Sequence, residues 1–288
     1  MQKFTLLVGN GINNIEKDNS WENLIKEIGQ FCKIGFAIDD EKKKQFPLLY
    51  EEIFLSSARD CNIRENDLKK FIAEKVSVIK SNVLHDAIRA LPIDDIITTN
   101  YEFSLEGTMP EKNEGIVGEK LYSIFRHYTV DKKRVWHIHG DCLYPNSINL
   151  GFEHYGGQLQ NIRNYVATGT SYASKKASRL PLMKRLETGH LNGASWIDLF
   201  FTTHLHIIGL TFGFVETDLW WLLTYRARMK IRDKKLVQNQ ISYYIPERFA
   251  AASKHKLDLF KATDVNVVVI AKDDEAYYRH IFEKITNR

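Results

Sequence analysis

Six short apolar runs recur along the chain, separated by longer stretches of mixed polarity. A compact apolar run bounded by glycine, proline or asparagine indicates a strand that is buried within a sheet. The runs cover residues 4–8, 93–99, 134–139, 205–209, 241–245 and 265–270. Strands separated by helices are typical of a parallel sheet, so we predict an α/β fold with a Rossmann-like, mostly parallel sheet flanked by helices.

The stretches between these runs predict helices and one long loop. Apolar side chains share one helical face between residues 68 and 79, and similar spacing recurs elsewhere. Residues 107–133 are polar and contain several glycines, which favours a loop. We expect a single domain covering residues 1–288, in which segments at about 39–91 and 151–203 assemble into a smaller helical module.

Residues with useful chemistry follow four of the predicted strands. These stretches are Gly9–Asn13, Asn100–Glu102, His139–Asp141 and Gly209–Thr211. The carboxyl ends of parallel strands meet at one edge of a sheet, where ligands of α/β proteins bind. The sequence therefore predicts one pocket that combines two glycine loops, an amide and an imidazole.

The segment at 134–141 allows two interpretations. Alternate residues of a strand point to the same face, so His137, His139 and Asp141 could together hold a metal ion. Alternatively, His139 could act alone as an acid–base group. Residue 142 is a cysteine, where a metal-binding HxHxD motif would continue with histidine, and no further ligand cluster is visible. We therefore expect no metal and interpret His137 as a support for its strand.

Charge and composition exclude several classes of protein. The chain has 40 basic and 36 acidic side chains, a net charge of +4, so direct nucleic-acid binding is not expected. No apolar run approaches the roughly 18–20 residues that cross a bilayer, and no signal peptide is visible. The three cysteines are widely spaced and fit a reducing compartment. We predict a soluble, cytoplasmic protein without a membrane partner.

One further predicted helix follows residue 213. It carries Glu216 and Asp218 in its first turn, and Arg226, Arg228 and Lys230 lie near its end. The helix dipole favours this distribution of charge. We interpret the basic residues as a solvated helix end.

Four short motifs occur in a specific order: Gly-Asn-Gly-Ile-Asn, Thr-Thr-Asn-Tyr-Glu, His-Ile-His-Gly-Asp and Gly-Leu-Thr-Phe. In this order the chain, from residue 4 to about residue 230, resembles the sirtuin-like NAD hydrolases of bacterial anti-phage defence. The resemblance implies that Asn100 is the catalytic asparagine and His139 the catalytic histidine. It also implies that two loops bind NAD, through Gly9, Asn10, Gly11 and Asn13 and through Gly209 and Thr211. We further expect Tyr101, Glu102 and Gly140, which adjoin the catalytic pair, to bind NAD, although the family usually has aspartate where this chain has Glu102.

The resemblance implies hydrolysis of NAD to nicotinamide and ADP-ribose, which would deplete the cell of NAD during phage infection. An enzyme of this kind needs control, so we expect a homo-oligomer, an activating partner protein encoded nearby, or a signal. The zinc-binding cysteine pairs of true sirtuins are absent from the sequence, which argues against a protein deacylase. Two alternatives stay open: a non-catalytic sensor of NAD or ADP-ribose, and a metal-dependent hydrolase using His137, His139 and Asp141.

The chemistry of the reaction suits these residues. Cleavage of the nicotinamide–ribose bond passes through an oxocarbenium-like state, and nicotinamide leaves as a neutral molecule without a general acid. What remains is to deprotonate water or a ribose hydroxyl, which an imidazole such as His139 can do, and to hold the ribose by hydrogen bonds, which the amide of Asn100 can do.

Overall fold

A mostly parallel sheet forms the centre of the molecule in a computed structural model that describes residues 3–15, 21–34, 44–170 and 178–287. Its seven strands lie in the order β3-β4-β2-β1-β5-β6-β7, and every neighbouring pair is parallel except β3 and β4. The predicted Rossmann-like α/β fold is confirmed. The strands are β1 (Phe4–Val8), β2 (Asp95–Thr98), β3 (Tyr128–Val130), β4 (Lys133–His137), β5 (His204–Ile208), β6 (Ile241–Pro246) and β7 (Val265–Ile270).

Strand β3 is the part of the sheet that the sequence pattern did not predict. It lies within residues 107–133, which we expected to be a loop, and pairs with β4 as an antiparallel hairpin at the sheet edge. Asp131 and Lys132 connect the two strands with φ angles of 48° and 67°. Two consecutive left-handed residues match the right-handed twist of a hairpin, but this turn usually contains Asn-Gly or Asp-Gly. The Asp-Lys pair therefore gave no recognisable signal.

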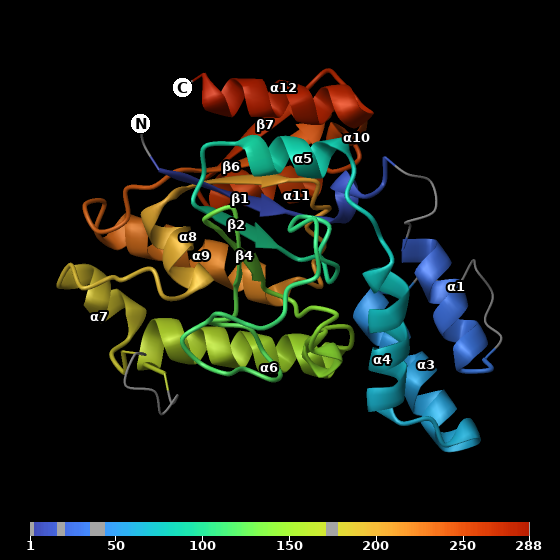
Figure 1. Cartoon of the computed structure of the whole chain (residues 1–288). Helices are drawn as coiled ribbons and strands as arrows, with labels where there is room; N and C mark the ends of the chain where they lie inside the picture. The colour runs from blue at the N-terminus through green and yellow to red at the C-terminus, as the bar shows by residue number, and fades with distance from the viewer. Residues whose placement is uncertain (1–2, 16–20, 35–43, 171–177, 288) are drawn as a thin grey trace.

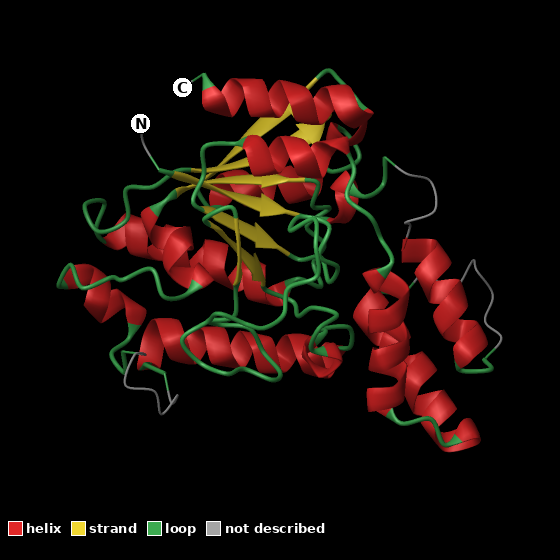
Figure 2. Ribbon diagram, viewed as in Figure 1, coloured by secondary structure: helices red, strands yellow, loops and turns green. Residues whose placement is uncertain are grey.

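Helices cover both faces of the sheet, as Figure 2 shows. Successive residues of a strand point to opposite faces, so Leu6 and Val8 of β1 pack under α5 and α12, whereas Leu7 belongs to the core with α6, α8, α9 and α11. The helices are α1 (Trp21–Phe31), α3 (Phe46–Cys61), α4 (Glu65–Ser77), α5 (Val83–Ala90), α6 (Phe152–Arg163), α7 (Leu182–Glu187), α8 (Trp196–Thr202), α9 (Thr217–Arg232), α10 (Glu247–Ala250), α11 (Lys254–Ala262) and α12 (Asp274–Thr286).

Helices α1, α3 and α4 form a separate group beside the carboxyl edge of the sheet (Figure 1). Their apolar core also contains Tyr101, Phe103 and Cys142, which follow β2 and β4. Helix α3 contacts α6, where the two segments predicted for the helical module meet. Residues 39–43 and 171–177 of those segments lie outside the described residues. This group of helices therefore borders the ends of the strands that carry the predicted site.

Strand β1 is the point at which the order of the sheet reverses. The chain passes from β1 to β2 and β4 on one side, and β5, β6 and β7 continue on the other. In open parallel sheets such a reversal leaves a crevice at the carboxyl ends of the two central strands, and ligands bind there. In this chain the crevice lies at the ends of β1 and β5, which are followed by Gly9 and Gly209.

Candidate functional site

A cleft of about 630 Å³ opens at the carboxyl edge of the sheet. Side chains from all four predicted motifs line it: Asn10 and Gly11, Asn100 to Glu102, His139, and Gly209 with Thr211. Helices α1 and α4 contribute the opposite wall. Of the predicted site residues, Gly9, Asn13 and Gly140 are not among the described residues that line this cleft.

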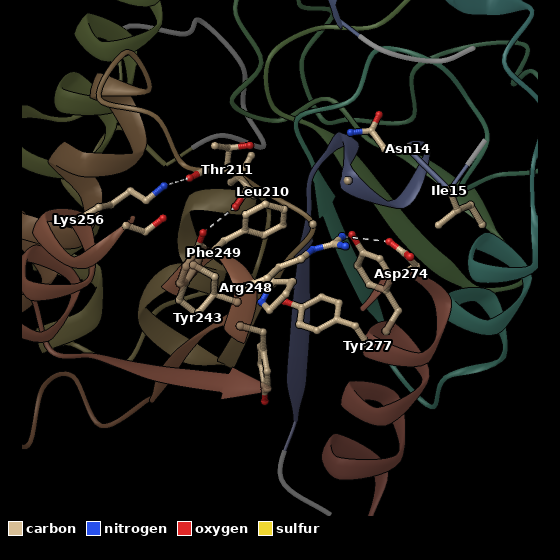
Figure 3. A pocket seen from close by; sticks show the side chains of 17 residues that line it. Asn14, Ile15, Leu210, Thr211, Tyr243, Arg248, Phe249, Lys256, Asp274 and Tyr277 are labelled. Atoms are coloured by element: carbon tan, nitrogen blue, oxygen red, sulfur yellow. Dashed lines mark hydrogen bonds and ion pairs between the residues drawn. The ribbon is translucent and has the colours of Figure 1, made fainter. Parts of the chain in front are cut away.

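A second cavity, of about 390 Å³, adjoins the cleft on the side of β6. The two cavities share Gly11, Asn14, Gly209, Leu210 and Thr211. Figure 3 shows Tyr243, Phe249 and Tyr277 around this cavity, with Arg248 bonded to Asp274. The Arg248 guanidinium lies 3.0 Å from the Asp274 carboxylate. Lys256 donates a hydrogen bond to the Thr211 carbonyl oxygen in the same view. The glycine loops thus separate two adjoining binding spaces.

The two glycine loops touch each other directly. The Gly11 N–H donates to the Gly209 carbonyl oxygen at 2.7 Å, and the Gly9 N–H donates to the Ile208 carbonyl oxygen at 3.0 Å. A Cβ atom on Gly9 or Gly11 would lie only 2.6 or 2.7 Å from the Gly209 oxygen. Glycine is therefore required at both positions for the loops to pack together, whether or not a ligand is present.

Asn13 holds the glycine loop after β1 in place by two side-chain hydrogen bonds. Its Nδ2 donates to Asn10 Oδ1 at 2.8 Å and to Glu102 Oε1 at 2.7 Å. Burial raises the pKa of the Glu102 carboxyl, and the bond from Asn13 lowers it only in part. Asn13 thereby ties the loop after β1 to the loop after β2.

His139 follows β4 by two residues and is almost completely buried. Gly140, with a φ of 92°, turns the backbone away at once, and a Cβ there would clash with Ser147. The ring of Tyr155 on α6 packs edge-on against the imidazole. Gly140 therefore shapes the turn that places His139 in the cleft.

His139 pairs with Asp218, for which the sequence indicates only a place in the first turn of a helix. The imidazole Nε2 donates to Asp218 Oδ2 at 2.9 Å, from the first turn of α9. Because a carboxylate accepts, Nε2 carries the proton, and Nδ1 holds the lone pair when the ring is neutral. Burial alone would lower the pKa of His139, but the charges of Asp218 and Glu216 outweigh it and raise the pKa above its usual value. The arrangement is that of an oriented base.

Asn100 lies in the loop after β2, two residues beyond the strand, and is 5% exposed. Its Nδ2 is buried and has no hydrogen-bond partner among the described residues, although it lies on the wall of the cleft. A buried donor without a partner is costly in a native protein and marks a place where a ligand can bond. This is the property expected of a residue that holds a substrate.

His137 holds the backbone of Asn100. Its Nδ1 donates to the Asn100 carbonyl oxygen at 2.7 Å, and its Nε2 contacts Glu106 Oε1 at 2.9 Å. Burial lowers the pKa of this imidazole, but Glu106 outweighs burial and the pKa rises to about 9. His137 is therefore a charged side chain inside the core that fixes the loop carrying Asn100.

The residues of the metal-binding interpretation have separate partners. Asp141 pairs with buried Arg126 at 3.2 Å and accepts two backbone N–H groups, while His137 and His139 bond to Glu106 and Asp218. Within the described ranges, no three histidine, cysteine or acidic side chains are arranged to hold a metal ion. These contacts do not favour that alternative.

Arg226 corrects one sequence interpretation. We expected a solvated side chain, but Arg226 is fully buried on α9 and bonds to Asn239 and, at 3.2 Å, to Asp264. Its guanidinium joins α9 to the turns before β6 and β7. Arg226 therefore stabilises the packing of α9 against the sheet and is not part of a solvated helix end.

The comparison with protein families gives one match. Residues 94–241, more than half of the chain, match the SIR2-like domain. The chain belongs to the SIR2-like domain family. SIR2-like domains bind NAD, and the matched part of this SIR2-like domain contains Asn100, His139 and Asp218. Among curated proteins, no significant match is found. In the described part of the chain, no helix combines the length and the apolar character that crossing a membrane requires.

Proposed function

We propose that this SIR2-like domain is an NAD glycohydrolase, which converts NAD and water into nicotinamide and ADP-ribose. One observation carries the proposal: two adjoining cavities meet at the β1–β5 crevice, and the larger one is lined by Asn100 and by His139, whose imidazole bonds to Asp218. Two linked spaces suit the two halves of a dinucleotide, and the crevice is where parallel sheets bind such ligands.

The two cavities differ in the residues that line them, and this difference suggests which half of NAD each one binds. Tyr243, Phe249 and Tyr277 give the smaller cavity aromatic walls suited to adenine. The larger cleft is lined by the His139 imidazole and by the unpartnered amide of Asn100, which suit a ribose that reacts. The diphosphate would then cross the glycine loops that both cavities share.

The reaction needs one bond broken and one formed. The C1′–N1 bond of the nicotinamide ribose breaks, and its electron pair neutralises the pyridinium nitrogen, so nicotinamide leaves uncharged. Water forms a new bond to C1′, and its proton passes to Nδ1 of His139, directly or through a ribose hydroxyl. Asn100 Nδ2 donates a hydrogen bond that holds the ribose, and Asp218 stabilises the imidazolium that results.

The cellular role follows from the resemblance to sirtuin-like defence enzymes. We propose that NAD depletion in the cytoplasm limits phage infection and that a homo-oligomer, a partner protein or a signal activates the enzyme. These parts of the proposal are tested by measuring NAD in infected cells that carry the wild-type or the His139→Ala gene, with and without neighbouring genes.

The decisive experiment measures nicotinamide release from NAD by chromatography. We expect turnover by the wild type, with neighbouring gene products added where needed, and a loss of at least about 100-fold in Asn100→Ala and His139→Ala. His190→Ala, which removes an exposed histidine, is the matched control and should keep full activity. No nicotinamide under any of these conditions would refute the activity, and ADP-ribose binding without turnover would favour the sensor alternative.

A further inference from the structure

Glu216 occupies an unusual position at the start of α9. It is the residue at which a side chain normally caps the helix, yet its carboxylate makes no capping bond. The side chain instead lines the larger cleft together with His139 and Thr211. Its Oε2 is buried and has no hydrogen-bond partner among the described residues.

A buried carboxylate oxygen without a hydrogen-bond partner destabilises a fold unless something compensates for it. Part of the compensation here is local, because His139, a backbone hydrogen bond from Gly213 and the ammonium of Lys256 all favour the negative charge. Burial still dominates and raises the pKa of Glu216 to about 7. The Oε2 atom of Glu216 can therefore accept a hydrogen bond from a donor that enters the cleft.

We propose that Glu216 is a further catalytic residue, whose carboxylate accepts a hydrogen bond from a ribose hydroxyl of the bound dinucleotide and whose charge tunes His139. This inference rests on the proposed NAD hydrolysis and adds a residue to it. A ribose hydroxyl is the donor that fits best, because it is neutral and because Asn100 and His139, which we propose to act on the reacting ribose, line the same cleft. A phosphate in this place would be repelled by the carboxylate.

The ionisable groups that face Glu216 decide the sign of the electrostatic effect. Besides the histidine after β4, they come from the loop after β2, α6, α9, β6 and α11. They are Tyr101, His139, Tyr155, Asp218, Tyr243 and Lys256. Ionised Glu216 stabilises the imidazolium form of His139, so loss of the negative charge lowers the pKa of that imidazole.

The first experiment follows the His139 imidazole by NMR titration of the full-length protein. His139→Gln assigns its signal among the ten histidines. In Glu216→Gln the midpoint should move to lower pH, whereas Glu283→Gln, the same change on an exposed face of α12, should leave it in place. An unmoved midpoint in Glu216→Gln would overturn the proposal, and this outcome does not depend on turnover.

The second experiment tests contact with the ribose. NAD is compared with analogues that lack the 2′- or the 3′-hydroxyl of the nicotinamide ribose. A hydrogen bond to a charged group corresponds to a loss of about 10- to 100-fold in kcat/KM when it is removed. The wild type and Glu216→Asp should show this loss with one analogue, and Glu216→Gln should show a smaller loss, because its amide oxygen is an uncharged acceptor.

The outcomes separate the two proposals. Equal discrimination by the wild type and Glu216→Gln overturns the ribose contact while NAD hydrolysis stands. Absence of any turnover overturns NAD hydrolysis, while the titration still decides whether Glu216 tunes His139. A pH profile of kcat/KM that moves to lower pH in Glu216→Gln, in step with the NMR midpoint, supports both.

Discussion

Replacing Asp218 with asparagine tests whether the pair with His139 orients the base. The change removes a charge but hardly alters the size of a side chain that is fully buried. Both partners are shielded from water and joined at 2.9 Å, so solvent does not screen the interaction. A hydrogen bond to a charged group contributes about 1.5–3 kcal/mol, so we expect kcat to fall by about 10- to 100-fold.

The pH dependence of activity tests the same pair independently, through the direction in which the midpoint of the profile moves. His139 must be neutral to accept a proton, so wild-type activity should rise with pH through a midpoint above the usual histidine value. Without Asp218, burial dominates and lowers the pKa of His139, so Asp218→Asn should reach its reduced plateau at lower pH.

A matched control separates orientation from stability. Asp198 is also buried and accepts a hydrogen bond from Tyr165 at 2.7 Å, away from the cleft. Asp198→Asn should lower the thermal midpoint but retain kcat below that midpoint. Nicotinamide release would be measured for all three proteins across the pH range. An Asp218→Asn variant with wild-type kcat and an unmoved profile would refute the reasoning.

Three further predictions follow from the site. The pKa of His137 is raised to about 9 in the folded state, so its pair with Glu106 should stabilise the fold fully below about pH 6.5. Up to about 3 kcal/mol of that stability should be lost as the pH rises through 9. Denaturant titrations of the wild type and His137→Phe measure this loss, and an equal pH dependence in both proteins would contradict it. Gly11→Ala should destabilise the protein by about 1–3 kcal/mol and abolish NAD binding, because its Cβ would press on Gly209. In Gly118→Ala a Cβ meets open space, so calorimetry should show unchanged stability and unchanged NAD binding. Dialysis against a chelator should leave nicotinamide release unchanged, and activity restored only by added zinc would instead favour the metal-dependent alternative.

Much of the fold was predictable because its signals are local. The runs at 4–8 and 205–209 are short, apolar and bounded by glycine, and they form the central strands β1 and β5. Since the strands are parallel, the motif after each one was expected at a common edge, and the cleft does contain Asn100 and His139.

The partners of these residues could not be predicted, because they depend on distant contacts. Asp218 lies 79 residues from His139 and already has a sufficient local explanation in the first turn of a helix. Glu106 is 31 residues from His137 and stands in a stretch without periodicity. Only the three-dimensional arrangement shows that these carboxylates face imidazoles.

The contact between the two glycine loops has a mechanical consequence. Gly11 and Gly209 are bonded backbone to backbone, with no space for either loop to shift without the other. We therefore expect a displacement of either loop to displace the other, so that the residues shared by the two cavities move together. A change in one loop, such as a side chain added at Gly11, should accordingly disturb both cavities at once rather than one of them.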